Sequence, residues 1–411
     1  MAKAQPQIVG IDLGTTKVCV LIAEPSDTGS IDITGVGTAP SRGMRKGAIV
    51  NLDACVSSIK QAVEEAELMA GCSVERAFVG VAGPHVRGLN SRGVVAIPAR
   101  DHEVTREDVQ RVLAAARAVN IPPDRETIHV LPQEFTVDDQ DGIHDPVGMT
   151  GAKLEASVHI VTASVTATQN LVNSVNRAGV EVEEVVLEQL AAAEAVLTQD
   201  EKDMGCALID IGAGTTDLVI YDRGAIRHIA VLPTGGEHVT NDIAVGLRTP
   251  IPEAERIKKR FGCALAGLVQ EEDTIEVPSV GGRKSRVLSR QILCEIIQPR
   301  VEEIFQLIAE EFARSAFDRS LHAGVVLTGG GSMLEGIQEI AEDALDLAVR
   351  RAEPAGAGGL TGSVATPQHA TVVGLALYGA RRRQEAPQRP EHPFMLFRMG
   401  DRVRHWLSEL F

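Results

Sequence analysis

Ile8-Val-Gly-Ile-Asp-Leu-Gly-Thr-Thr-Lys17, near the start of the 411-residue chain, has the pattern of a buried strand that breaks at a glycine. A second apolar run over residues 18–23 follows at once, so the pattern predicts a strand, a tight turn and a second strand. Asp12 would end the first strand, where its carboxylate could help to hold a hydrated magnesium ion.

The turn between these strands carries residue types that suit a phosphate group. Gly14 has no Cβ atom, so the backbone there can come close to a ligand. Thr15 and Thr16 add hydroxyl and turn N–H groups that favour an anion, and Lys17 adds a positive charge. Turns of this composition also occur in proteins that bind no phosphate, so this turn alone leaves both interpretations open.

A second copy of the pattern favours phosphate binding. Ala207-Leu-Ile-Asp-Ile-Gly-Ala-Gly-Thr-Thr-Asp217 repeats it 198 residues later (210 minus 12), with a turn that is expected to be two residues longer. Two such loops facing each other would clamp a triphosphate, with Asp12 and Asp210 flanking one metal ion. The predicted phosphate contacts of the second loop are Gly212, Gly214, Thr215, Thr216 and Asp217.

A third glycine-rich turn follows a predicted strand at Ala323-Gly-Val-Val-Leu-Thr-Gly-Gly-Gly-Ser-Met-Leu334. Ser332 is expected to be the N-cap of a helix that starts there. An ordinary strand-to-helix turn would explain the pattern by itself. With two phosphate loops upstream, we instead expect a base and ribose to lie on bare backbone at Gly329, Gly330, Gly331 and Met333.

The composition fits an α/β fold and excludes some partners. Hydrophobic residues make up 44% of the chain and aromatic residues only 3%, which suits aliphatic cores between strands and helices. A net charge of −16 argues against nucleic acid as a partner. The six cysteines form no CxxC pair, which favours a reducing compartment over a disulfide framework. The sequence predicts neither a signal region nor a membrane-spanning helix.

The three motifs, in this order, resemble those of the actin, Hsp70 and sugar-kinase ATPase superfamily. The resemblance implies two duplicated halves around a cleft that binds ATP and Mg²⁺. Residues 188–197 are similar to the first connecting helix, whose leading acidic residue in relatives orients the attacking water. This implies catalytic roles for Glu188, Asp12 and Asp210, although Glu188 would also suit a solvated helix start. Relatives usually have proline where this chain has Gln189.

Two further segments resemble parts of the same superfamily. Residues 372–379 are similar to the second connecting helix, where Gly374 would allow close packing. Residues 235–242 and 254–258 resemble the loop and helix beside the adenosine pocket, which implies ligand contacts from Gly235, Gly236, Glu255 and Lys258. Glu255 and Lys258 are equally typical of an exposed i,i+3 ion pair.

An inserted unit of about 80 residues distinguishes this chain from actin, Hsp70 and MreB. It spans residues 84–162, with strands near 86–97, 127–132 and 154–161 and a helix over 107–119 preceded by Thr105. Its position, together with residues 43–51 and 131–135, resembles the family of the bacterial division protein FtsA.

This resemblance implies a division of the chain into subdomains. Residues 1–83 and 163–200 would form subdomain 1A, and 84–162 the inserted SHS2-type subdomain 1C. Subdomain 2A would take 201–240 and 321–383, and subdomain 2B would take 241–320. A disordered linker over 384–393 would lead to an amphipathic helix over 394–411.

The last 18 residues repeat apolar side chains at helical spacing, after a proline-rich segment that suits an extended linker. Such a helix could dock on its own protein, bind a partner or lie on a membrane. The linker and the flanking arginines favour an anionic membrane surface. The predicted membrane residues are Leu396, Phe397, Arg398, Met399, Arg402, Val403, Trp406, Leu407, Leu410 and Phe411.

Membership of this family implies a division scaffold on the cytoplasmic face of the bacterial inner membrane, at the septum. It would polymerise, bind FtsZ through subdomain 2B and recruit later division proteins, with subdomain 1C as a candidate contact. ATP would be mainly structural, with slow hydrolysis at most. The alternatives are a PilM-type pilus-assembly protein, a small-molecule kinase and an Hsp70-like chaperone. The terminal helix and the absence of a downstream substrate-binding domain argue against them.

Overall fold

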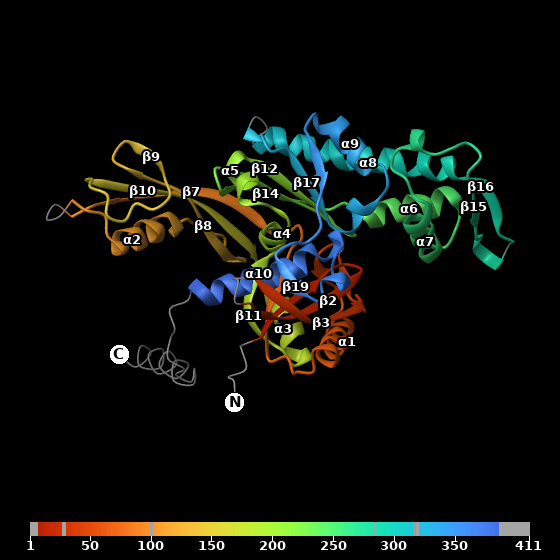
Figure 1. Ribbon diagram of the computed structural model, residues 1–411, viewed down its shortest axis with the longest axis horizontal. Helices are drawn as coiled ribbons and strands as arrows, with labels where there is room; N and C mark the ends of the chain where they lie inside the picture. The colour runs from red at the N-terminus through yellow and green to blue at the C-terminus, as the bar shows by residue number, and fades with distance from the viewer. Residues whose placement is uncertain are drawn as a thin grey trace.

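The structure, a computed structural model, describes residues 7–26, 30–98, 102–282, 284–315, 317 and 320–385 (Figure 1). The predicted membrane helix and residues 386–393 of the predicted linker lie outside these ranges. The first two linker residues are instead helical, because α10 (Ala370–Glu385) continues through them. No helix in the described ranges has the length and apolar character needed to cross a membrane.

The first half is built on a six-stranded sheet with the order β11-β6-β1-β2-β3-β19. β1 (Ile8–Leu13) pairs antiparallel with β2 (Lys17–Pro25) and parallel with β6 (Arg76–Val81), which confirms the predicted strand–turn–strand unit. Helices α1 and α3 cover one face, and α4 and α10 cover the other. The remaining elements are β3 (Ile31–Pro40), β11 (Glu181–Leu187), β19 (Ala357–Gly359), α1 (Leu52–Ala70), α3 (Val165–Ala178) and α4 (Glu188–Val196).

The second half repeats this plan in a five-stranded sheet with the order β14-β13-β12-β17-β18. β12 pairs antiparallel with β13 and parallel with β17, as β1 does with β2 and β6. The same pairing in both halves explains why the two sequence motifs match. The strands are β12 (Cys206–Ile211), β13 (Thr216–Asp222), β14 (Ala225–Leu232), β17 (Val325–Thr328) and β18 (Val349–Arg351).

The two phosphate-type turns have the same length, so the prediction of a longer second turn is wrong. Asp12 pairs with Cys19, and Asp210 pairs with Asp217, seven residues further along in both cases. The second motif has two additional residues, Ala213 and Gly214, before its threonine pair. The threonines are therefore displaced along the hairpin, and Thr216 lies in β13. Asp217 is therefore the counterpart of Cys19.

Helices and a small hairpin complete the second half. Helices α6, α7, α8 and α9 enclose a hydrophobic core with the second sheet. Their bounds are α6 (Gly236–Leu247), α7 (Ile251–Phe261), α8 (Arg290–Ser315) and α9 (Ile337–Leu345), with α5 (Gln199–Met204) before β12. The hairpin of β15 (Thr274–Val277) and β16 (Arg286–Ser289) lies at the far end of the molecule (Figure 1).

The inserted unit is a separate four-stranded sheet, β7-β10-β8-β9, with its own apolar cluster under α2 (Arg106–Arg117). Thr105 caps this helix in a capping box with Asp108, as the sequence indicated, but the helix ends at Arg117, two residues before the predicted end. The strands are β7 (Arg87–Ala96), β8 (Arg125–Val137), β9 (Gln140–Ile143) and β10 (Lys153–Ser164).

The inserted sheet also contacts the second half, at strand β14. The side-chain amide of Asn90 donates to Arg227 O at 3.1 Å, and that of Gln133 donates to Ile226 O at 2.7 Å. Buried His159 holds Asn90 through a hydrogen bond of 2.7 Å between Nδ1 and Oδ1. The insert contacts the first half as well, where His129 of β8 accepts a hydrogen bond of 3.0 Å from Leu187 N of β11, so it packs on both halves.

Candidate functional site

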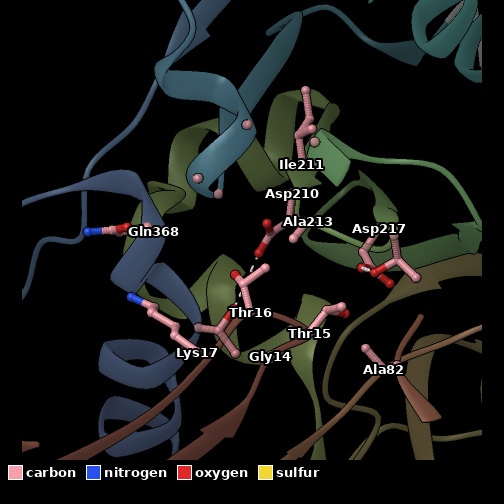
Figure 2. A pocket seen from close by; sticks show the side chains of 18 of the residues that line it. Gly14, Thr15, Thr16, Lys17, Ala82, Asp210, Ile211, Ala213, Asp217 and Gln368 are labelled. Atoms are coloured by element: carbon pink, nitrogen blue, oxygen red, sulfur yellow. Dashed lines mark hydrogen bonds between the residues drawn. The ribbon is translucent and has the colours of Figure 1, made fainter. Parts of the chain in front are cut away.

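One cavity of about 600 Å³ lies between the two halves. Its walls include both turns, the start of α4, the helix α7 and a short 3₁₀ turn, η4 (Gly330–Met333). A small hairpin of β4 (Met44–Arg45) and β5 (Ala48–Ile49) also reaches it. Figure 2 shows Asp210 of β12 and Asp217 of β13, which flank the second turn, facing Thr15 and Thr16 of the first turn.

The first turn supplies Asp12, Gly14, Thr15, Thr16 and Lys17 to this cavity. The Nζ atom of Lys17 is buried and has no hydrogen-bond partner in the described part of the chain. A buried cation without a partner is costly, so this position suits an anion that the protein itself does not provide.

The aspartates of the second turn are held by hydroxyl and amide groups. Thr371 of α10 donates to Asp210 Oδ2 at 3.3 Å, and Thr215 donates to Asp217 Oδ2 at 2.9 Å. The second oxygen of Asp217 accepts a hydrogen bond of 2.8 Å from Gln189 Nε2, whose side chain is only 1% exposed. Gln189 of α4 and Thr371 of α10 thereby hold the carboxylates of Asp217 and Asp210 in place.

Four carboxyl groups share the floor of the cavity. Burial raises the pKa of Asp12 to about 6, although Lys17 opposes the shift. Burial, and then the neighbouring carboxylates, raise the pKa of Asp210 to about 7 and of Asp217 to about 8. The pKa of Glu188 is raised well above its usual value for the same reasons. The site therefore disfavours full ionisation until a cation joins it.

The donor set fits a magnesium ion carried by a phosphate ligand. Among the described residues, no group of three or more His, Cys, Asp or Glu side chains could hold a metal ion by itself. Mg²⁺ is commonly held by one or two carboxylates, with water and phosphate oxygens completing its shell. Asp12 and Asp210, the two ligands that the sequence predicts, both line the cavity, and their role as the side chains that would hold the ion stays a prediction.

The glycine turn Gly329, Gly330 and Gly331 lines the cavity, together with Met333. The predicted helix start at Ser332 is wrong. Ser332 lies inside η4 and donates to Gly329 O at 2.8 Å, and α9 starts only at Ile337, after Gly336 in a left-handed conformation. A Cβ atom at Gly330 would meet nothing closer than 3.8 Å, so open space lies beside that backbone.

The predicted residues of the adenosine side form a connected group. Lys258 pairs with Glu255 at 2.7 Å and donates to Gly236 O at 2.9 Å. Lys258, Glu255 and Gly236 all line the cavity, so the pair is not a plain surface pair. Residues 236–242 are helical rather than a loop, because α6 begins at Gly236.

Three predicted ligand contacts do not line the cavity but support it. Thr216 is fully buried and donates to Thr234 O at 2.9 Å. A Cβ atom at Gly235 would lie 2.7 Å from Gly212 O. At Gly214 it would lie 2.7 Å from Thr15 Oγ1 and 3.1 Å from the Cα atom of Lys46. Gly214 thus allows the two halves to approach each other.

Sequence reasoning missed several residues of the site. Thr371 lies one residue before the predicted connecting helix, and Gln189 follows the predicted Glu188, so both were adjacent to recognised motifs. Gln368 and His85 line the cavity from segments without a motif, and only the fold brings them there.

Comparison with known proteins gives consistent matches along most of the chain. A family model described as "Cell division protein FtsA" matches residues 207–374, and one described as "SHS2 domain inserted in FTSA" matches residues 83–162. The chain is 50% identical to the cell division protein FtsA of Pseudomonas aeruginosa, over 92% of this chain and 90% of that protein. It is 43% identical to that of Neisseria meningitidis over 100% of both chains.

Solved structures share the fold at low identity. A PilM–PilN type IV pilus biogenesis complex matches with a TM-score of 0.65 and 17% identity, over 92% of this chain and 99% of that chain. MreB5 of Spiroplasma citri bound to AMPPNP matches with a TM-score of 0.55 and 15% identity, over 93% and 98%. The predicted actin-like fold of two duplicated halves with an SHS2 insertion is confirmed.

Proposed function

The chain belongs to the FtsA family of cell division proteins, and we propose that it is an ATP-binding scaffold that polymerises on the inner membrane. In this proposal it tethers FtsZ filaments to the cytoplasmic face of the membrane at the septum and recruits later division proteins. The nucleotide site is the part of this proposal that the described residues support most directly.

The observation that carries the nucleotide proposal is the meeting of Asp12, Lys17 and Asp210 at one cavity from two equivalent turns. The unpartnered Nζ atom of Lys17 would bind a phosphate oxygen, and Gly14 and Gly212 would let turn N–H groups approach the phosphates. The open backbone at Gly330, with Glu255 and Lys258 nearby, would receive the nucleoside.

Magnesium, when bound, would offset the negative charge of the phosphates and of the four carboxyl groups. Asp12 and Asp210 would orient its water ligands, while Thr371 keeps Asp210 in place. Glu188 is the first residue of α4, and its side chain packs against Gly80 of β6. It would accept a proton from an attacking water.

Polymerisation and membrane attachment would act together. A single amphipathic helix over residues 394–411 would bind an anionic surface reversibly. Many copies on one polymer would bind with avidity, so assembly would convert weak contacts into stable attachment. The MamK double helical filament shares the fold, with a TM-score of 0.52, and supports the capacity of such a body for self-association.

Calorimetry with Mg-ATP tests the nucleotide site, and vesicle co-sedimentation tests the scaffold. Asp210→Ala is expected to abolish ATP binding in a protein that still melts cooperatively. Wild-type protein on anionic vesicles is expected to carry FtsZ into the pellet in the presence of ATP. Micromolar ATP affinity in Asp210→Ala would refute the site, and FtsZ remaining in the supernatant would refute the tether.

A further inference from the structure

The cavity continues beyond the two phosphate-type turns to a region at the base of the inserted unit. Figure 2 shows Ala82 beyond Thr15, on the side of the cavity opposite Gln368. Gly83, next to Ala82, has its Cβ position 3.1 Å from the His85 ring and 3.0 Å from Gly47 O of the β4–β5 hairpin, and α3 contacts β5. The cavity residues of these segments include Met44, Ile49, His85, Ala167 and Leu171. These side chains are mostly apolar, and His85 is the titratable group among them.

His85 presents a nitrogen that the protein leaves unpaired. Its Nε2 atom is buried and has no hydrogen-bond partner among the described residues. Burial, and then the charges of Arg125 and Arg87, lower the pKa of the imidazole, so the ring is neutral at physiological pH. A neutral ring with its proton on Nε2 can donate one hydrogen bond, and the neighbouring arginines favour an anionic acceptor.

The main chain of His85 belongs to the incoming connection of the inserted unit, and Arg125 joins it to the outgoing one. Arg125 Nη2 donates to His85 O and to Thr162 O, both at 2.9 Å. Its Nε atom donates to Thr162 Oγ1 at 3.1 Å. One guanidinium from inside the insert therefore clasps both of its connections to the first half, through charge-assisted hydrogen bonds.

The far side of the insert rests on the second half. Asn90 and Gln133 donate to backbone carbonyl groups of β14, as described above. A change in the position of His85 relative to the second half must therefore alter the Arg125 clasp or the contact with β14. The contact with β14 consists of these two neutral amide hydrogen bonds and a longer ion pair of 3.7 Å between Glu134 of the insert and Arg227. The charge-assisted bonds of the clasp are shorter, at 2.9 Å, so the contact with β14 is the part that we expect to yield.

We propose that His85 contacts the terminal phosphate of a bound nucleoside triphosphate and that the Arg125 clasp passes this contact to the inserted unit. This rests on the proposed nucleotide site. Gln368 adjoins the glycine turn, with its Cβ atom 3.8 Å from the Cβ position of Gly330, and Figure 2 shows Ala82 on the opposite side of the cavity. The His85 ring stands 3.1 Å from the Cβ position of Gly83, the residue after Ala82, so His85 belongs to the end remote from the glycine turn, where a γ-phosphate would distinguish ATP from ADP. The insert would then take up different positions on β14 in the two nucleotide states.

The first test compares ATP and ADP affinities by calorimetry, with magnesium present. His85→Ala is expected to weaken ATP binding about tenfold or more, as for loss of one hydrogen bond to a charged group, and to leave ADP binding unchanged. His85→Gln, which keeps a donor, is expected to retain part of the preference. The matched control is His144→Ala, because His144 is exposed in the insert and away from the cavity.

The second test measures hydrogen exchange in peptides that cover residues 88–92 and 226–229. In the wild type, replacing ADP by ATP is expected to change exchange in both peptides. Arg125→Met should abolish this response when each nucleotide is present at saturating concentration, so that any change in ATP affinity does not alter the occupancy of the site. Arg117→Met, on the exposed end of α2, is the control. If Arg125→Met does not fold, His85→Ala decides, because it too must lose the response.

The outcomes separate the inference from the function on which it rests. If the wild type binds neither nucleotide, the proposed function is wrong and the inference falls with it. If the wild type binds ATP and His85→Ala keeps the same ATP-to-ADP ratio and exchange response, the inference alone is overturned. If His85→Ala loses the preference for ATP over ADP and the exchange response but still binds ADP, the inference is supported.

Discussion

Gly374 of α10 packs directly on the backbone of Ala191 in α4, where a Cβ atom would stand only 1.8 Å from Ala191 O. This contact brings the two connecting helices together beneath the cavity. The helices carry Gln189 and Thr371, which hold Asp217 and Asp210. The close approach at one glycine thus positions two carboxylates of the site.

Gly374→Ala is expected to destabilise the protein severely, because the added methyl group cannot fit without separating the helices. Overpacked cores typically lose about 1–3 kcal/mol, and this contact should reach or exceed the upper end. Chemical denaturation gives the change in unfolding free energy. Gly362→Ala is the control, since nothing lies within 4 Å of its Cβ position. Equal stabilities of the two variants would contradict the packing.

Gly330→Asp is expected to prevent nucleotide binding without harming the fold. The new side chain would have room, with its nearest neighbour 3.8 Å from the Cβ position, but it would place a negative charge in the cavity. Calorimetry should show no ATP binding, while the melting temperature stays near that of the wild type. Gly362→Asp introduces the same charge elsewhere and should bind normally. Retained micromolar affinity in Gly330→Asp would mean that the nucleoside lies elsewhere.

Much of the fold could be predicted because both halves repeat one local pattern. A strand ending in aspartate, a glycine turn and a second strand are short-range features that a sequence displays directly. The third glycine run was harder, since Ser332 looked like a helix cap and instead closes a 3₁₀ turn onto Gly329. Competition between local side-chain and backbone hydrogen bonds decided that detail.

The predicted site residues came from these motifs, and those that were missed came from tertiary structure. His85 and Gln368 reach the cavity only because distant strands and helices assemble around it. The equal length of the two turns was also hidden, because strand register is set by pairing across the hairpin and not by the spacing of similar letters.

His129 should make stability depend on pH between about 4 and 6.5. Burial lowers its pKa to about 4, and its Nε2 atom accepts a hydrogen bond of 3.0 Å from Leu187 N. The unfolded chain, with an ordinary histidine pKa, binds the proton first. The contribution of His129 to the free energy of unfolding is therefore fully present above pH 6.5 and is lost as the pH falls towards 4.

His129→Gln keeps an acceptor for Leu187 N and removes the titration. The difference in the free energy of unfolding between wild type and variant should change by at most about 1.4 kcal/mol per pH unit across this window. Denaturant titrations at several pH values measure it, and the difference cancels the opposite contribution of the cavity carboxyl groups. Parallel stability curves for the two proteins would exclude a neutral buried His129.

Deletion of residues 394–411 should release the protein from anionic vesicles and leave ATP binding intact. Trp406→Glu should have the same effect, because a charge would enter the proposed apolar face. Co-sedimentation measures binding, and the melting temperature is expected to stay unchanged. A large fall in melting temperature would show that the segment docks on the protein instead. Ser408→Glu adds the same charge on the opposite face of the predicted helix and serves as the control.

Strand β14 is the outer strand of the second sheet, and its carbonyl groups at Ile226 and Arg227 accept hydrogen bonds from the inserted unit. An uncovered outer strand is a template for association between chains, so the insert also acts as a guard against aggregation. A chain without the insert would leave the carbonyl groups of Ile226 and Arg227 open to pairing with another chain.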